Sequence, residues 1–217
     1  MQIIEDSCQG LGAKYRGQFA GLFGIVGSYS FYPAKTLGCF GDGGAIVTND
    51  SKIAEKIEQL RDHGRRKSDG KVTMFGRNGR LDNVQAAILN HKLKKFDKNI
   101  KRRREIAELY SDRLSDVHEI HLPVGPAQDL LRFDTFQNYE VRVEERDKLK
   151  KFLASRDVAT IIQWGGWMLH QFDKLGLKSD VVFGEQMSKQ NLLLPMNHIL
   201  SNDQVEYTCE MIKKFYR

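Results

Sequence analysis

Glycine is concentrated in the first part of this 217-residue chain. Fourteen of the 19 glycines lie within the first 79 residues, and ten of these lie between Gly10 and Gly44. Glycine adopts positive φ angles and lets a ligand approach the backbone, so this density predicts tight turns around a binding site. Short apolar segments at Gln2–Glu5, Val26–Tyr32 and Gly44–Thr48 alternate with the glycine-rich loops and predict strands.

The composition is that of a globular domain rather than a disordered or fibrous chain. Hydrophobic residues make up 41% and charged residues 29%. No apolar run approaches the ~20 residues that span a bilayer, and Met1–Asp6 lacks the pattern of a signal peptide. Three widely spaced cysteines, Cys8, Cys39 and Cys209, suit a reducing compartment. We therefore expect a cytoplasmic protein with no membrane partner.

The pattern of the chain predicts two parts that meet within a long helix. The first part, residues 1–100, is an α/β arrangement whose helix over 52–62 has the apolar face Ile53, Ile57 and Leu60. Further helices are predicted over 82–94 and from there to about 114. Residues 101–217 hold few glycines and predict a small α+β domain. Its predicted strands and helices are Phe136–Val143, Ala159–Gln163, 146–155 and 202–215.

Four polar residues in the first 35 positions form the strongest candidate site. Asp6 follows the first predicted strand, Gln9 lies three residues later, and Ser30 and Lys35 lie at and beyond the end of the second strand. Ligands of α/β sheets bind at the carboxyl ends of strands. An acid and a lysine in such a crevice suit pyridoxal phosphate, whose aldehyde binds lysine and whose pyridine nitrogen needs a carboxylate. By spacing alone, however, Asp6 and Lys35 are more often two surface residues.

The local sequence favours the cofactor site over the surface alternative. Segments Glu5–Ala13, Ser28–Gly38, Gly41–Ala45 and Gly76–Ala87 resemble the DegT/DnrJ/EryC1/StrS family of sugar aminotransferases that use pyridoxal phosphate. The resemblance covers essentially the whole chain. It implies the carboxyl-terminal part of an aspartate-aminotransferase-like (fold type I) large domain with a mostly parallel sheet, followed by a small α+β carboxyl-terminal domain.

The resemblance also implies a role for each residue of the candidate site. Lys35 matches the lysine that forms the Schiff base and moves the proton, and Asp6 matches the carboxylate that pairs with the pyridinium nitrogen. Gln9 matches a glutamine at the cofactor ring, and Ser30 matches a serine at its phosphate. Asn78 matches an asparagine that reaches the phosphate from a partner subunit, which implies a homodimer with shared active sites. A branch with histidine in place of Lys35 performs dehydration, so Lys35 argues against that branch.

Two further residues are candidates for binding a nucleotide-linked keto sugar. Arg80 lies inside a family motif and suits the diphosphate, although a structural salt bridge would also explain it. His170, with Trp164 nearby, lies where the family's small domain approaches the substrate, although packing explains both equally well. Other basic residues near Arg80 could also meet the diphosphate: Arg65, Arg66, Lys67 and Arg77. A solvated basic loop explains Arg65, Arg66 and Lys67 equally well.

The net charge of +6, from 34 basic and 28 acidic residues, favours acidic ligands without choosing among them. A basic run invites a nucleic-acid interpretation, but its apolar spacing favours a solvated helix face, and we expect no nucleic-acid partner. The run comprises Lys92, Lys94, Lys95, Lys98 and Lys101–Arg104.

The resemblance implies that part of the family's large domain precedes Ile3. That part carries the phosphate loop, the aromatic ring that stacks on the cofactor and the first strands of the sheet. We therefore expect the carboxyl-terminal portion of an enzyme that moves an amino group from an amino acid, most simply glutamate, to a nucleotide-linked keto sugar. The alternative is a truncated, inactive remnant that dimerises or binds a partner. An incomplete sheet predicts exposed apolar surface and poor solubility.

Overall fold

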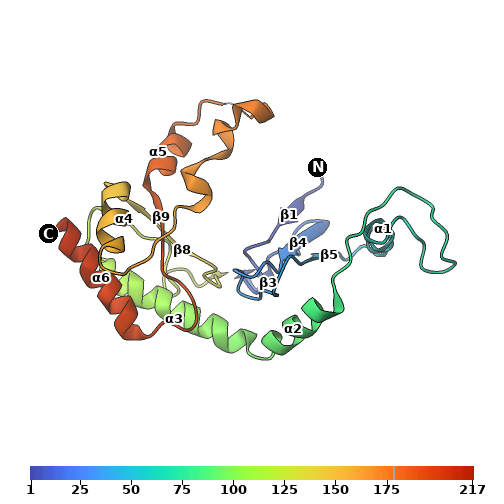
Figure 1. Cartoon of the computed structure of the whole chain (residues 1–217), viewed down its shortest axis with the longest axis horizontal. Helices are drawn as coiled ribbons and strands as arrows, with labels where there is room; N and C mark the ends of the chain where they lie inside the picture. The colour runs from blue at the N-terminus through green and yellow to red at the C-terminus, as the bar shows by residue number, and fades with distance from the viewer. Residues whose placement is uncertain (178) are drawn as a thin grey trace. The chain divides into compact units, whose positions relative to one another are not determined.

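A computed structural model describes residues 1–177 and 179–217, and its chain divides into two compact units (Figure 1). The amino-terminal unit comprises Met1–Ile100 and Leu131–Thr135, and the carboxyl-terminal unit comprises Lys101–Leu130 and Phe136–Arg217. The strands are β1 (Ile4–Asp6), β2 (Lys14–Tyr15), β3 (Gln18–Phe19), β4 (Val26–Ser30), β5 (Gly44–Val47), β6 (Ile120–His121), β7 (Arg132–Phe133), β8 (Tyr139–Val143) and β9 (Asn191–Leu194). The helices are α1 (Ser51–Arg61), α2 (Asn83–Leu93), α3 (Phe96–Leu114), α4 (Arg146–Ala154), α5 (Val182–Gln190) and α6 (Asn202–Tyr216), with 3₁₀ turns η1 (Gln163–Gly166), η2 (Leu169–Gln171) and η3 (Asp173–Leu175).

The amino-terminal unit holds a three-stranded sheet in which β4 lies between β1 and β5 (Figure 1). The pair β1 and β4 is parallel and places Asp6 opposite Ser28, whereas β5 runs antiparallel to β4. A second sheet has the order β3-β2-β7. Strands β2 and β3 form a hairpin, and Arg16 and Gly17 both adopt the positive φ angles of its tight two-residue turn.

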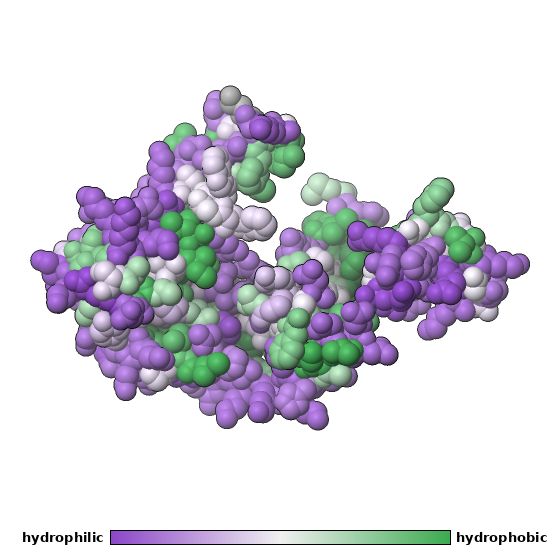
Figure 2. Space-filling view, viewed as in Figure 1, coloured by the Kyte–Doolittle hydropathy of each residue, from purple (hydrophilic) through white to green (hydrophobic). Residues whose placement is uncertain are grey.

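Burial differs between the two units. In the amino-terminal unit the buried apolar cluster consists of Leu37, Cys39 and Leu89. Helix α1 begins at an Asp50 cap that accepts two backbone N–H groups, but none of its residues is buried. The apolar face predicted for the core is therefore only partly covered. In Figure 2, hydrophobic residues reach the surface as green areas between hydrophilic ones.

The carboxyl-terminal unit has a continuous core built on the antiparallel sheet β6-β8-β9. Eighteen buried residues form this core, to which α3 contributes Ile106 and Tyr110 and α6 contributes Val205 and Ile212. The helices predicted over 146–155 and 202–215 are confirmed as α4 and α6. Alternating burial along β8 also matches a strand with one face toward the core.

Two expectations for the carboxyl-terminal unit are wrong. The strand predicted over Ala159–Gln163 is reduced to a single bridge between Ile161 and Leu193, because η1 begins at Gln163. The basic run is not wholly a solvated face. Arg103 is only 6% exposed. Its Nη1 donates to the carbonyl oxygens of Phe136 at 2.9 Å and of Gln137 at 3.2 Å.

No helix in the described part of the chain has the length and apolar character that a bilayer crossing requires. All three cysteines are free thiols, and Cys39 and Cys209 are buried.

Candidate active site

The parallel pair β1 and β4 brings polar side chains to one edge of the first sheet. Asp6 is the last residue of β1, and Ser30 is the last residue of β4. Ser28 pairs with Asp6 and, because side chains alternate along a strand, lies on the same face as Ser30. The Ser28 hydroxyl donates to the carbonyl oxygen of Glu5 at 3.3 Å. This edge is where a ligand of an α/β sheet binds.

Cys8 holds the Asp6 carboxylate. The Cys8 N–H donates to Oδ1 of Asp6 at 3.1 Å, and the Cys8 Sγ lies 3.7 Å from the Ser28 hydroxyl. Hydrogen bonds from the thiol and then the backbone of Cys8, followed by the positive charge of Lys35, lower the pKa of Asp6. Burial and the hydrogen bond to Asp6 raise the pKa of the Cys8 thiol. Asp6 is therefore ionised at neutral pH, and Cys8 is a neutral donor.

Lys35 lies on a closely packed loop that follows β4. Its backbone N–H donates to the Tyr32 carbonyl at 2.9 Å, and the Tyr32 N–H donates to the Ser30 hydroxyl at 3.2 Å. Gly38 closes the loop, because a Cβ there would lie 2.5 Å from the Pro33 carbonyl oxygen. These contacts fix the loop that carries the partly buried Lys35, whose positive charge acts on Asp6.

Gln9, the other residue predicted at this edge, lies in the turn that directly follows β1. Gln9 is exposed and belongs to a turn in which the Gly10 N–H donates to the Ser7 carbonyl at 2.9 Å. The structure thus brings Asp6, Ser30 and Lys35 to one edge of the sheet, with Gln9 on the loop directly after it.

Asn78 and Arg80 lie on a segment packed against the end of α1. Asn78 forms an isolated bridge with Asp62, and the Gly79 N–H donates to the Arg61 carbonyl at 2.7 Å. The backbone of this segment lies very close to the residues that follow α1. A Cβ on Gly76 would overlap the backbone nitrogen of Gly64. We call this close approach of the backbones around Gly64 and Gly76 the crossing. Its conformation determines the position of Asn78.

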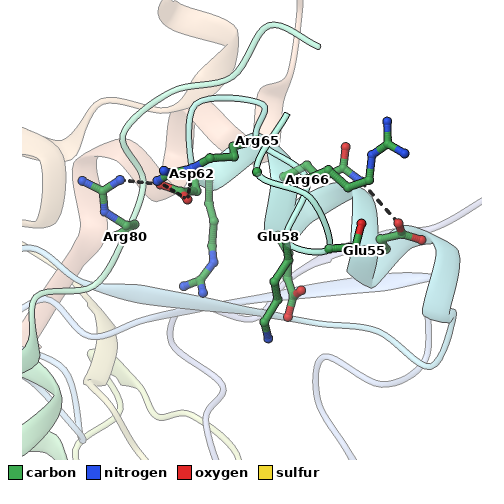
Figure 3. Close-up of a pocket in the computed structure, with 11 residues that line it drawn as sticks. Glu55, Glu58, Asp62, Arg65, Arg66 and Arg80 are labelled. Atoms are coloured by element: carbon green, nitrogen blue, oxygen red, sulfur yellow. Dashed lines mark hydrogen bonds and ion pairs between the residues drawn. The ribbon is translucent and has the colours of Figure 1, made fainter. Parts of the chain in front are cut away.

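Arg80 lines a cavity of about 690 Å³ beside α1 and the loop that follows it. Figure 3 shows Arg65 and Arg80 directed at Asp62 from two sides. Asp62 forms an ion pair with Arg80 and another with Arg65 at 2.9 Å. Hydrogen bonds from Arg80 first, and then from Arg65, lower the pKa of Asp62. The salt bridge considered for Arg80 is thus present, in an exposed setting.

His170 belongs to the carboxyl-terminal unit and is paired there. Its Nε2 lies 3.0 Å from Oε1 of Glu185, and Nε2 of Gln171 donates to the other oxygen of Glu185 at 3.1 Å. Gln171 first, and then His170, lower the pKa of Glu185. A Cβ on Gly184 would lie 2.6 Å from Cε1 of His170, so glycine makes room for the ring. The imidazole is a largely covered group that fastens η2 to α5.

Sequence reasoning missed the partners of the predicted residues. Strand alternation from Ser30 signals Ser28, and Cys8 lies two residues beyond Asp6, where a turn returns its N–H to the carboxylate. Asp62 and Glu185 carry no comparable signal, because each meets its partner only after distant segments have packed.

The comparisons with known proteins identify the family. The model of the DegT/DnrJ/EryC1/StrS aminotransferase family matches residues 1–213. The chain belongs to this family. The S. venezuelae DesV structure, solved in complex with a ketimine intermediate, superposes on 100% of this chain and 58% of its own, with a TM-score of 0.91 and 32% identity. The fold is therefore that of the DegT/DnrJ/EryC1/StrS aminotransferases.

Curated members of the family match most of the chain. A dTDP-3-amino-3,4,6-trideoxy-alpha-D-glucose transaminase of Streptomyces venezuelae is 40% identical over 165 residues, which are 76% of this chain and 42% of that protein. A pleiotropic regulatory protein of Geobacillus stearothermophilus is 38% identical over 218 residues, which are 99% of this chain. The chain spans 58% of the length of this second relative.

Proposed function

We propose that this chain carries the cofactor-binding half of an aminotransferase that uses pyridoxal phosphate and acts on a nucleotide-linked keto sugar. The observation that carries the proposal is the ionised Asp6 carboxylate beside Lys35, at the carboxyl ends of two parallel strands. The amino donor is an amino acid, most simply glutamate. The transaminase named among the relatives supports the nucleotide-linked acceptor.

The side chains at this edge fit pyridoxal phosphate in their chemistry. An ionised carboxylate suits a protonated pyridine nitrogen, a serine hydroxyl suits a phosphate, and a lysine amine suits an aldehyde. When bound, the cofactor supplies an electron sink for the carbon that loses its proton. Asp6 maintains that sink by keeping the ring nitrogen protonated, and Cys8 keeps Asp6 ionised and oriented.

Lys35 performs the proton transfer. Its Nζ would accept the proton from the α-carbon of the amino donor and deliver it to the reacting carbon of the cofactor, and the reverse transfer would serve the keto sugar. The turn from Ser30 to Gly38 restricts where this amine reaches. Restriction matters because general acid–base transfer requires hydrogen-bond distance between the base and the reacting carbon.

Three more residues extend the proposal to the cofactor and the substrate. Gln9 contacts the cofactor ring, and Asn78 reaches the phosphate across a homodimer, so two chains share each site. Arg80 binds the diphosphate of the sugar nucleotide, since a guanidinium has five donors and Asp62 occupies only part of them. His170 contributes to the acceptor site while Glu185 fixes its ring.

The test is amino transfer by the purified full-length protein. Supplied with pyridoxal phosphate, glutamate and a dTDP-linked 3-keto sugar, it should release 2-oxoglutarate and yield an aminated sugar nucleotide by mass spectrometry. Lys35→Ala should abolish both products, and the matched control Lys52→Ala, an exposed lysine of α1, should retain them. Turnover that survives Lys35→Ala would contradict the role of this lysine.

A second candidate is a non-catalytic binding module. The small buried cluster of the amino-terminal unit supports it, because a poorly covered sheet suits a polypeptide that needs a partner. Absence of 2-oxoglutarate in a chain that still binds pyridoxal phosphate at Lys35 would favour this second candidate over an active transaminase.

A further inference from the structure

The loop that carries Lys35 has a sequence that leaves its backbone flexible. Four of the twelve residues from Pro33 to Gly44 are glycines. Glycine loses more conformational freedom on folding than any other residue, so such a loop keeps one conformation only where other groups hold it. Lys35 depends on that conformation, because a base must reach the reacting carbon at hydrogen-bond distance.

One face of α2 lies against this loop. Gln85, Leu89 and Lys92 are spaced i, i+4 and i+7, so they share one face of the helix. Leu89 is buried in a cluster with Leu37 and Cys39, which both belong to the loop. The other two side chains of this face are polar, and both bind the backbone of the loop.

The two polar contacts reach the loop just after Lys35. Oε1 of Gln85 accepts the backbone N–H of Phe40 at 2.8 Å. Nζ of Lys92 donates to the carbonyl oxygen of Gly38 at 2.5 Å and lies 4.9 Å from the centre of the Phe40 ring. The donor of this second bond is charged, and such hydrogen bonds are roughly twice as strong as neutral ones. The two contacts therefore fix a carbonyl and an N–H of the loop from outside it.

Plain packing does not explain this polar pair. Lys92 belongs to the basic run expected to be a solvated helix face, but it is half-buried and its ammonium group binds a backbone carbonyl. A helix that only covered the loop could use apolar side chains throughout, as it does at Leu89. Hydrogen bonds differ from apolar contacts because they depend on direction, so they hold particular backbone atoms in place.

We propose that Gln85 and Lys92 are positioning residues, which fix the backbone from Gly38 to Phe40 and thereby the point from which Lys35 reaches its reaction partner. The inference rests on the proposed function, which gives Lys35 its role. Neither side chain touches the reacting atoms in this assignment. Their contribution is pre-organisation, because a loop that is fixed before the ligand arrives does not have to be ordered when the ligand binds.

Variants of the two residues test the inference in the full-length protein. Gln85→Leu and Lys92→Met remove the hydrogen bonds at similar side-chain size, whereas Gln85→Glu keeps an acceptor and Lys92→Arg keeps a charged donor. The measurement is the initial rate at which pyridoxal phosphate and borohydride place a pyridoxyl group on Lys35, followed by peptide mass spectrometry. We expect the first two variants to slow this rate about 10- to 100-fold, as for a misplaced reactive group.

The same peptide maps contain the controls. The exposed Lys52 should be labelled at the same rate in every variant, which shows that the reagents act equally. Gln85→Glu and Lys92→Arg should restore most of the rate at Lys35. Lys95→Met removes an exposed lysine directly after α2 and should leave the rate at Lys35 unchanged. A Lys95→Met variant that slows Lys35 as much as Lys92→Met would overturn the inference.

Steady-state kinetics separate positioning from a loss of structure. In Gln85→Leu and Lys92→Met, kcat for amino transfer should fall while KM for glutamate stays unchanged, because the loop would place the base rather than bind the donor. A contact that is only structural would lower the urea midpoint and leave the kcat of the folded fraction at the native value. That second pattern would overturn the inference.

The outcomes also separate this inference from the proposed function. If Lys35 is preferentially labelled in the native protein and equally fast in Gln85→Leu and Lys92→Met, the positioning role is wrong and the cofactor site stands. If the native protein shows no preference for Lys35, the proposed function fails and the two contacts are structural alone. If the preference is present and falls in these variants while amino transfer is absent throughout, the reaction fails and the positioning role stands.

Discussion

At the scale of single residues, the Glu5 carboxylate organises the loop before β4. It accepts the backbone N–H groups of Gly21 at 2.8 Å and Gly24 at 2.6 Å, and that of Phe23 as well. Burial acts to raise the pKa of Glu5, but these three hydrogen bonds outweigh it and lower the pKa. A carboxyl whose pKa is lower in the folded state stabilises that state above its unfolded pKa. This contribution disappears as the pH falls through the folded pKa.

Acid should therefore open this loop. As the pH falls from 7 to below about 4, amide exchange at Gly21, Phe23 and Gly24 should accelerate beyond the intrinsic change in rate. Glu5→Gln should show faster exchange already at pH 7, with little further pH dependence, because a neutral amide oxygen is a weaker acceptor. Protection that is the same in both proteins across this range would contradict the role given to Glu5.

Arg103 is a buried charged residue of α3. Burial lowers the pKa of its guanidinium, and its Nη1 donates to backbone carbonyls of Phe136, Gln137 and, at 3.4 Å, Met196. Arg103→Met removes these hydrogen bonds from a buried position, so we expect a loss of about 1–3 kcal/mol in the free energy of unfolding. The measurement is urea denaturation. Arg113→Met on the same helix is the control, because Arg113 forms an exposed ion pair with Glu206, and exposed ion pairs contribute little to stability. Equal losses in the two variants would contradict this account.

At the scale of elements, the crossing between the end of α1 and the segment around Asn78 depends on glycine. Gly64 has φ of +75°, and a Cβ there would overlap the Met74 carbonyl oxygen. Gly64→Ala should therefore push the segment away from α1 and break the hydrogen bond from Gly79 to Arg61. Loss of protection of the Gly79 amide, measured by hydrogen exchange, is the expected result.

Gly70 provides the matched control for that variant. Its φ is +72°, but a Cβ there meets nothing within 4 Å. Gly70→Ala should cost only the left-handed backbone strain, about 1–2 kcal/mol, and leave the Gly79 amide protected. If both variants leave that amide protected, the crossing does not position Asn78.

Local sequence patterns predicted most of the helices and strands. The remaining elements depend on packing between residues that are far apart in the sequence. The helices carry their own signals, such as the Asp50 cap of α1 and the box formed by Ser201 and Gln204 at α6. The strand expected before Gln163 failed because the positive φ of Trp164 turns the chain away. Strand β7 was not predicted, since its pairing with Lys14 joins residues far apart in sequence.

The candidate site likewise has parts that local sequence patterns predicted and parts that depend on packing between distant residues. The rule that strand ends meet at one edge placed Asp6 with Ser30 and Lys35 from sequence alone. A salt bridge at Arg80 was left as one of two alternatives, and its partner Asp62 was not predicted, because the two residues meet only after distant segments have packed. The hydrogen bond from Cys8 to Asp6 follows the local rule that an Asp side chain accepts the backbone N–H two residues later, but this rule was not applied to Asp6 in the sequence.

At the scale of the whole molecule, apolar burial is unevenly divided between the units. The amino-terminal unit has an open apolar cavity of about 1250 Å³ beside β5 and α1. Among its lining residues, Ile46 is 53% exposed and Phe75 is wholly exposed. The expectation of exposed apolar surface is confirmed, while the expectation of poor solubility stays a prediction.

This division predicts two levels of stability in the intact chain. Hydrogen exchange should be slowest at β8, β9 and α6, where the core is continuous, and much faster at β1 and β5. A dye that binds exposed apolar surface should bind the native chain through the amino-terminal unit, and Phe75→Ser should reduce its binding. A single cooperative transition with equal protection in both units would contradict the uneven burial.

The most direct test of the account is where pyridoxal phosphate attaches. The chain is incubated with the cofactor and reduced with borohydride, and its peptides are mapped by mass spectrometry. We predict that the pyridoxyl group lies on Lys35 well above every other lysine, and that Asp6→Ala removes this preference while Asp42→Ala keeps it. Label spread over surface lysines such as Lys94 and Lys95, with Lys35 not preferred, would contradict the assignment of this edge as a cofactor site.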